Sequence, residues 1–205
     1  HGLKTYRLLR QYGLFAQLFP TLSAYFTETG DSYAERMIIT SLTSTDERIT
    51  DNLRINPAFL FAAFFWYPLR EKVDTLKNEG GLSNHDAYSL AANDILAQLC
   101  RTLAIRRHTT TIREIWSLQL QLLKRSGSAP SRLIEQPKFR AAFDLLAMRA
   151  EIEGGETIEL TQWWHEYQLS NLNQRDLLVK EQDKEKPKKK NYRRRYRRRK
   201  PKAAE

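Results

Sequence analysis

The stretch PAFLFAAFFWYPL, residues 57–69, is apolar on every side when it is drawn as an α-helix. A helix without a polar face packs in the middle of a helical bundle, because no side of it can be left to water. Asn56 and Pro57 are typical of a helix start, the first as a cap and the second in the first turn. The stretch contains Pro68 and is shorter than the roughly 20 residues that span a membrane. We therefore predict a central, buried helix and no membrane segment.

Amphipathic helices are predicted on both sides of this stretch. Apolar residues recur at helical intervals over residues 88–103 and over residues 139–150, and a last helix is expected over residues 157–169. A Ser or Thr with an acidic residue three positions later is typical of a helix start. The pairs of this kind are Ser32 with Glu35, Ser83 with Asp86, and Thr111 with Glu114. No segment alternates like a strand, so the sequence predicts an all-α helical bundle of roughly seven to nine helices.

The positive charge of the chain is concentrated at its C-terminal end. Residues 180–202 hold fourteen of the 34 Lys and Arg residues and three acidic residues, a net charge of +11. Glu205 subtracts one charge and residues 1–179 are neutral, which gives the total of +10. Beyond Lys184 only Tyr192 and Tyr196 are large apolar side chains, too few to offset the entropy of ordering. We expect a helical body over residues 1–179 and a disordered basic tail over residues 180–205.

The tail combines closely spaced cations with two tyrosines, a composition suited to an unpaired nucleic-acid strand. A polyanion relieves the repulsion between the cations and releases its own counterions on contact. The planar guanidinium of Arg holds phosphate oxygens in pairs, and a Tyr ring stacks on a base for about 1–3 kcal/mol. The tail residues that we assign to this contact are Lys188, Lys189, Lys190, Tyr192, Arg193, Arg194, Arg195, Tyr196, Arg197, Arg198, Arg199 and Lys200. A solvating tail, a nuclear localisation signal and a patch for anionic lipid are the alternatives, and charge alone does not distinguish RNA from DNA.

Smaller basic positions lie on the helical body. We add Arg106 with Arg107, and Lys138 with Arg140, to the candidate site, since together with the tail they would extend one binding track. Each of them alone also fits an ordinary solvated face. So does Arg149, which, like Lys138 and Arg140, lies off the apolar stripe of residues 139–150. Of the neighbouring Trp163 and Trp164, at least one is expected to pack in the bundle, while an exposed one would stack on a base.

No catalytic or metal-binding motif stands out. The four histidines are scattered, and no second His stands four residues after His165. No glycine loop has the spacing that cradles phosphate, and no Asp-x-Asp pair occurs. The single cysteine, Cys100, fits a core thiol in a helical stretch. We predict no catalytic residue, no metal ligand and no cofactor in this chain, which alone should be inactive.

Four segments of the body resemble the C-terminal half of the bacterial poly(A) polymerase family, in the nucleotidyltransferase superfamily. They are YRLL (residues 6–9), NPAFLFAA (56–63), IWSLQLQ (115–121) and PKFRAAFDLLA (137–147), and the arginine-rich end is similar as well. The resemblance implies a helical body that guides RNA 3′ ends to an N-terminal head. In this family the head carries the catalytic Asp-x-Asp pair, Mg²⁺ and ATP.

The resemblance also implies a function and partners. It implies template-independent addition of AMP from ATP, in mRNA processing and decay, in the cytoplasm and away from membranes. The implied partners are single-stranded RNA, the catalytic head of the same polypeptide, and RNA-decay proteins. Two alternatives stay open: the equivalent part of a CCA-adding tRNA nucleotidyltransferase, and a non-enzymatic adaptor that binds RNA or protein. The missing initiator Met leads us to expect a piece of a longer polypeptide.

Overall fold

The computed structural model describes residues 1–27 and 30–185, and within them all regular structure is helical. Nine of the helices have seven or more residues, which confirms the predicted all-α class and helix number. The tail residues 186–205, which we expect to be disordered, lie outside the described residues. The helices are α1 (Gly2–Gln11), α2 (Leu14–Leu18), α3 (Pro20–Ser23), α4 (Tyr33–Thr50), α5 (Pro57–Phe64), α6 (Trp66–Asn78), α7 (Asn84–Thr102), the 3₁₀ turn η1 (Arg106–His108), α8 (Thr109–Gln121), α9 (Ala129–Ile134), α10 (Phe139–Glu153), α11 (Glu156–Leu169) and α12 (Leu172–Glu185).

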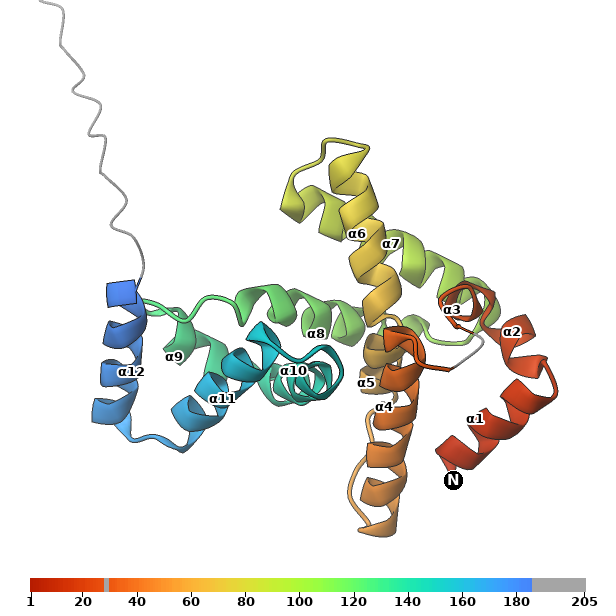
Figure 1. The fold of residues 1–205 in the computed structure, drawn as a ribbon, viewed down its shortest axis with the longest axis horizontal. Coiled ribbons are helices and arrows are strands. Elements are labelled where there is room, and N and C mark those ends of the chain that lie inside the picture. The colour runs from red at the N-terminus through yellow and green to blue at the C-terminus, as the bar shows by residue number, and fades with distance from the viewer. Residues whose placement is uncertain (28–29, 186–205) are drawn as a thin grey trace, which may run out of the picture.

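The helices are spread along one long axis, with α1–α3 at one end and α12 at the other (Figure 1). Two hydrophobic clusters follow this axis. The larger one surrounds α5 and draws on α4, α6, α7 and α8, and the smaller one joins α11 to the end of α8. Helix α10 belongs to both, since Leu145 faces the first cluster and Leu146 the second. The body is therefore held together by a helix that is buried on two sides.

The stretch 57–69 lies in the larger cluster, as predicted, but it forms parts of two helices. Ala58, Ala62 and Ala63 of α5 are fully buried. The break falls at Phe65, and Pro68 stands in the first turn of α6. Proline is tolerated there because it has no N–H to donate, and in one continuous helix its ring would clash with the carbonyl four residues earlier. The single helix suggested by composition is thus divided by Pro68.

Two of the three predicted helix starts with Ser or Thr are confirmed. The hydroxyls of Ser32 and Ser83 accept hydrogen bonds from the N–H groups of Glu35 and Asp86, each at 3.2 Å. The prediction for Thr111 is wrong, because the η1 turn leads directly into α8 and the helix has already begun at Thr109. Asn56 also caps as predicted, accepting from the N–H of Ala58 at 3.0 Å.

The C-terminal part of the body contains one helix more than the sequence analysis predicts. The last predicted helix, over residues 157–169, is followed by a further helix, α12, which extends to Glu185. The division into a body over residues 1–179 and a tail over residues 180–205 stays a prediction. The expectation that at least one of Trp163 and Trp164 packs in the bundle is confirmed, and since both are buried in the smaller cluster, neither is available to stack on a base. Trp164 also donates its indole N–H to the carbonyl of Leu122 at 2.8 Å.

Arg149 was expected on a solvated face of α10, and this expectation is wrong. It is 7 % exposed and donates to both carboxylate oxygens of Glu153, at 2.9 and 3.0 Å. A third donation, at 3.0 Å, reaches the side-chain oxygen of Gln119 on α8. Its guanidinium lies 4.6 Å from the centre of the Trp66 ring. Because α10 is buried on two sides, Arg149 faces a neighbouring helix although it lies off the apolar stripe.

The Arg149–Glu153 pair makes stability depend on pH. Burial alone would raise the pKa of Glu153, but the hydrogen bonds and charge of Arg149, with the Tyr67 hydroxyl, outweigh it and hold the pKa below its ordinary value. Such a carboxylate stabilises the fold at neutral pH, and this contribution is lost as pH falls through its folded-state pKa. We expect Glu153→Gln to unfold at lower denaturant than the unmodified protein at pH 7, with the difference shrinking towards pH 3. A difference that stayed constant in denaturant titrations across this range would contradict the expectation.

Candidate nucleic-acid interface

The sixteen residues assigned to the candidate site fall into two groups. The twelve on the tail lie outside the described residues. The other four are described: Arg106 and Arg107 are exposed on η1, Arg140 is exposed on α10, and Lys138 is half-buried just before it. Only the last two of these four line a cavity on the body.

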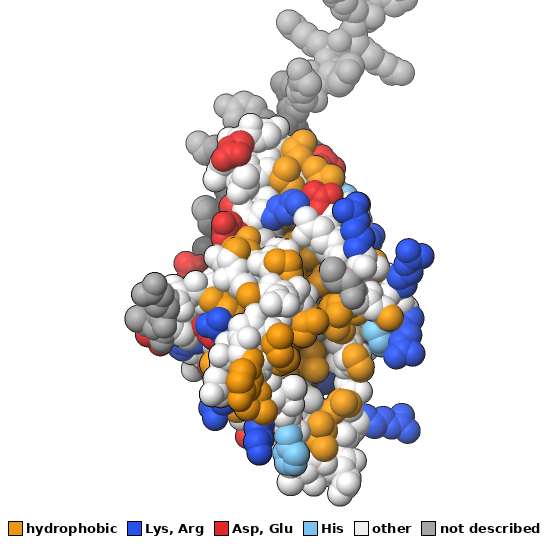
Figure 2. Space-filling model, turned by 90° about the vertical axis from the view of Figure 1, so that its right-hand side faces the viewer, with side chains coloured by type: hydrophobic (Ala, Val, Ile, Leu, Met, Phe, Trp, Pro, Cys, Tyr) orange, Lys and Arg blue, Asp and Glu red, His pale blue; other side chains and the backbone are white. Residues whose placement is uncertain are grey.

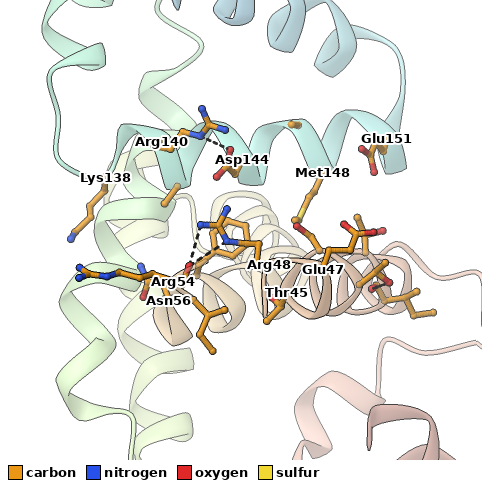
Figure 3. Close-up of a pocket in the computed structure, with 18 of the residues that line it drawn as sticks. Thr45, Glu47, Arg48, Arg54, Asn56, Lys138, Arg140, Asp144, Met148 and Glu151 are labelled. Carbon is orange, nitrogen blue, oxygen red and sulfur yellow. Dashed lines mark hydrogen bonds and ion pairs between the residues drawn. The ribbon is translucent and has the colours of Figure 1, made fainter. Parts of the chain in front are cut away.

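Lys138 and Arg140 line a cleft between α4 and α10 with a volume of about 830 Å³ (Figure 3). We call it the α4–α10 cleft. The lining residues of each helix recur at helical spacing, because residues three or four positions apart lie on one face of a helix. The residues spaced in this way are Ser44, Glu47 and Arg48 on α4, and Arg140, Asp144, Met148 and Glu151 on α10.

The loop between α4 and α5 closes one end of the cleft. Arg48 donates to the backbone carbonyl of Arg54 through Nε at 3.3 Å and Nη2 at 3.1 Å, and so holds this loop against the end of α4. Asn56 follows in the same loop as the cap of α5. The side chains of Arg48 and Arg54 therefore lie in the same cleft as Lys138 and Arg140.

Charge is unevenly distributed along the cleft. Figure 3 shows Arg54 and Lys138 extending at one end and Glu47 and Glu151 lying at the other. At the middle, Nε of Arg140 is 3.0 Å from a carboxylate oxygen of Asp144. The cleft thus has a basic end, a central ion pair and an acidic end.

Asp144 lies in a partly desolvated part of the wall. Its burial raises its pKa above the ordinary value, against the opposing charges of Arg140 on α10 and Arg48 on α4. Since Arg48 influences Asp144 from the opposite wall, the two helices bring their charges close together across the cleft. A ligand that enters here meets charged groups that are only partly screened by water.

A second groove of about 720 Å³ runs along α8 and shares Pro137 and Lys138 with the first. Its other basic side chain is Arg113. The η1 turn with Arg106 and Arg107 directly precedes α8, so these two cations stand at the start of the helix that lines this groove. They do not line the α4–α10 cleft. Lys138 is therefore a cation that lines both the cleft and the groove.

Sequence reasoning missed Arg48 and Arg54. They precede the motif around Lys138 by more than eighty residues, and neither stands in a basic cluster. Arg48 lies near the end of a helix and Arg54 in the loop after it, and such positions only weakly indicate a binding site, since cations are common on any protein surface. Only the packing of α4 against α10 brings them to Lys138 and Arg140.

A separate surface at the α1 end is apolar. Figure 2 shows hydrophobic side chains gathered on this face, with Lys and Arg at its margin. The exposed apolar side chains of α1, α2 and the turn between them are Leu8, Tyr12, Leu14 and Leu18. This surface is suited to contact with protein rather than with phosphates.

No three side chains of His, Cys, Asp or Glu are grouped within the described ranges so that they could hold a metal ion. None of the helices in those ranges has the length and hydropathy to cross a bilayer. Cys100 is a free, partly buried thiol that packs against the larger cluster.

Comparison with known proteins relates the chain to one family. The family model described as polymerase A arginine-rich C-terminus matches residues 80–201, which include the basic segment assigned to nucleic-acid contact. Poly(A) polymerase I of Haemophilus influenzae is 76 % identical over 184 residues, which are 89 % of this chain and 41 % of that protein. Poly(A) polymerase I of Escherichia coli O157:H7 is 50 % identical over 186 residues, 90 % of this chain and 40 % of that protein.

The enzyme of the same name from Salmonella typhi is 50 % identical over 185 residues, again 89 % of this chain and 40 % of its own length. The chain thus spans about two fifths of the length of the curated relatives that it matches.

Proposed function

Since the chain belongs to the polymerase A arginine-rich C-terminus family, we propose that it is the RNA-binding part of a poly(A) polymerase. In this proposal it holds single-stranded RNA and guides the 3′ end to a catalytic head, which adds AMP from ATP without a template. The observation that carries the proposal is the family match over residues 80–201, because it joins the helical body to the segment where the positive charge is concentrated.

The proposed contact is mainly electrostatic. The tail neutralises phosphates with its Lys and Arg side chains, and Tyr192 and Tyr196 stack on bases. Lys138, Arg140, Arg106 and Arg107 extend the track over the body. Phosphate contacts position a strand without reading its sequence, so binding is weakly sequence-dependent in this part of the interface.

ATP and Mg²⁺ belong to the catalytic head in this proposal. The described residues do not fit a metal site, since no suitable group of ligands lies among them. We therefore assign no chemical step to this chain and expect it to be inactive alone. A cytoplasmic location and contacts with RNA-decay proteins are further parts of the proposal, which rest on the kinship with bacterial poly(A) polymerases.

Salt dependence tests the electrostatic contact. If the tail neutralises about six phosphates of a single strand, the logarithm of the association constant should fall with the logarithm of salt concentration at a slope of roughly −4. Fluorescence anisotropy with a labelled unstructured RNA, measured between about 50 and 200 mM salt, gives this slope. An affinity that does not change with salt would overturn the proposed function.

The RNA used in this measurement also distinguishes the alternatives. A large preference for folded tRNA over unstructured RNA would favour a CCA-adding enzyme. A protein partner that stays bound after nuclease treatment of a lysate would favour an adaptor, for which the apolar α1 surface is the natural contact.

A further inference from the structure

The α4–α10 cleft has the size and the lining of a ligand site. Its volume of about 830 Å³ lies within the range of roughly 300–1,000 Å³ that is usual for ligand pockets. It is open along one side and bounded by two helices and a loop (Figure 3). The apolar part of its lining includes Ile39, Phe59 and Met148. A flat aromatic group can enter such a cleft and contact this lining.

The basic end of the cleft offers two cations that are not used by the fold. The side chains of Arg54 and Lys138 form no hydrogen bond or ion pair within the described ranges, and both extend at this end (Figure 3). Arg48 and Arg140, in contrast, are engaged with a backbone carbonyl and with Asp144. Unpaired cations at the mouth of a cleft suit a phosphate group, which the charges of Glu47 and Glu151 exclude from the other end.

The acidic end is suited to a different part of the same ligand. Ionised carboxylates such as Glu47 and Glu151 only accept hydrogen bonds. Adenine and cytosine carry an exocyclic amino group that donates hydrogen bonds, whereas the corresponding position of uracil is a carbonyl that accepts. Along α10, Lys138 and Glu151 are separated by about 20 Å at 1.5 Å per residue, and their long side chains reach into part of this length. This length accommodates a phosphate at one end and a base towards the other.

We propose that the α4–α10 cleft binds a nucleotide of the unpaired strand and selects adenine or cytosine over uracil. The phosphate lies at Arg54 and Lys138, the base lies against Phe59 and Met148, and its amino group faces Glu47 and Glu151. The inference rests on the proposed RNA binding and gives it a base preference that the tail, which contacts phosphates, does not have.

The test measures binding of labelled 12-nucleotide oligo(A), oligo(C) and oligo(U) to the full 205-residue chain and to its variants. The unmodified protein should bind oligo(A) and oligo(C) about tenfold more tightly than oligo(U), as expected for one well-placed contact to a base. The variant Glu47→Gln/Glu151→Gln should reduce this ratio to below about threefold without weakening oligo(U), because the carboxylate acceptors are gone and the negative charge is removed. Arg54→Gln/Lys138→Gln should weaken all three oligonucleotides by about tenfold, because the phosphate contacts are lost.

The matched control is Lys4→Gln/Arg7→Gln, which removes two exposed cations of α1 that do not line the cleft. It should change each of the three affinities by less than about twofold, because only the net charge of the protein is altered. Circular dichroism and thermal unfolding check that each variant is folded. A ratio of about one in the unmodified protein would overturn the base preference, and equal ratios in the unmodified protein and Glu47→Gln/Glu151→Gln would overturn its assignment to the cleft. Equal losses in Arg54→Gln/Lys138→Gln and the control would overturn the phosphate site. In each of these cases RNA binding itself would stand, whereas failure of all oligonucleotides to bind would overturn the proposed function as well.

Discussion

A chain that ends at Glu185 should bind single-stranded RNA at least about 100-fold more weakly than the full chain. Residues 186–205 contain twelve of the Lys and Arg residues and both tail tyrosines. Two base-stacking contacts of about 1–3 kcal/mol each account for roughly 2–6 kcal/mol, and every 1.4 kcal/mol is tenfold in affinity. The lost phosphate contacts add to this figure. The slope of affinity against salt should become shallower at the same time.

The same truncation should leave the stability of the body nearly unchanged. The side chains that form the two described hydrophobic clusters all precede residue 180. Anisotropy with labelled RNA and thermal unfolding of both chains provide the two measurements. Deleting only residues 203–205 is the matched control, because it removes no cation and no aromatic ring. A truncated chain that bound RNA as tightly as the full one would remove the tail from the proposed function.

Replacing Arg149 with leucine should destabilise the fold by about 3–5 kcal/mol, because it leaves the carboxylate of Glu153 partly buried without its cation. The hydrogen bond to Gln119 and the contact with Trp66 are lost as well. For a domain of this size each kcal/mol lowers the melting temperature by roughly 2–4 °C. Calorimetry or thermal circular dichroism should thus show a decrease on the order of 10 °C.

Helix α10 supplies the control for this substitution. Arg140 is also paired with an acidic residue four positions later, but its side chain is 77 % exposed. Arg140→Leu should therefore cost no more than about 1 kcal/mol, as is usual for exposed ion pairs. The double variant Arg149→Leu/Glu153→Leu should recover part of the lost stability, since no unpaired charge is left. Equal effects of Arg149→Leu and Arg140→Leu would contradict the role of Arg149 as a buried link between α8 and α10.

The two arginines illustrate how far sequence patterns predict side-chain environments. Arg140 and Arg149 both lie off the apolar stripe of α10, and both were expected on a solvated face. The expectation is right for Arg140 and wrong for Arg149. Periodicity describes one buried face of a helix, while α10 packs on two sides, against both clusters. The second buried face is made by helices that are distant in the chain, so no local pattern predicts it.

The same limit applies to the candidate site. The basic tail and the positions Lys138 and Arg140 were found from composition and local charge. Arg48 and Arg54 were not, because their relation to Lys138 exists only after α4 and α10 have packed together. Trp163 and Trp164 are the converse case: the sequence left one of the two rings open for base stacking, and packing buries both.

The sequence by itself determined the helical class, the caps at Ser32, Asn56 and Ser83, and the concentration of positive charge at the C-terminal end. These features depend on neighbouring residues, since propensity, capping and charge density are local properties. The tertiary structure decided that the helical stretch 57–69 is interrupted at Phe65 and that Arg149 is buried. It also decided that four basic and three acidic side chains share one cleft. Those outcomes depend on contacts between helices far apart in the chain, whose geometry is set by the packing of whole helix faces.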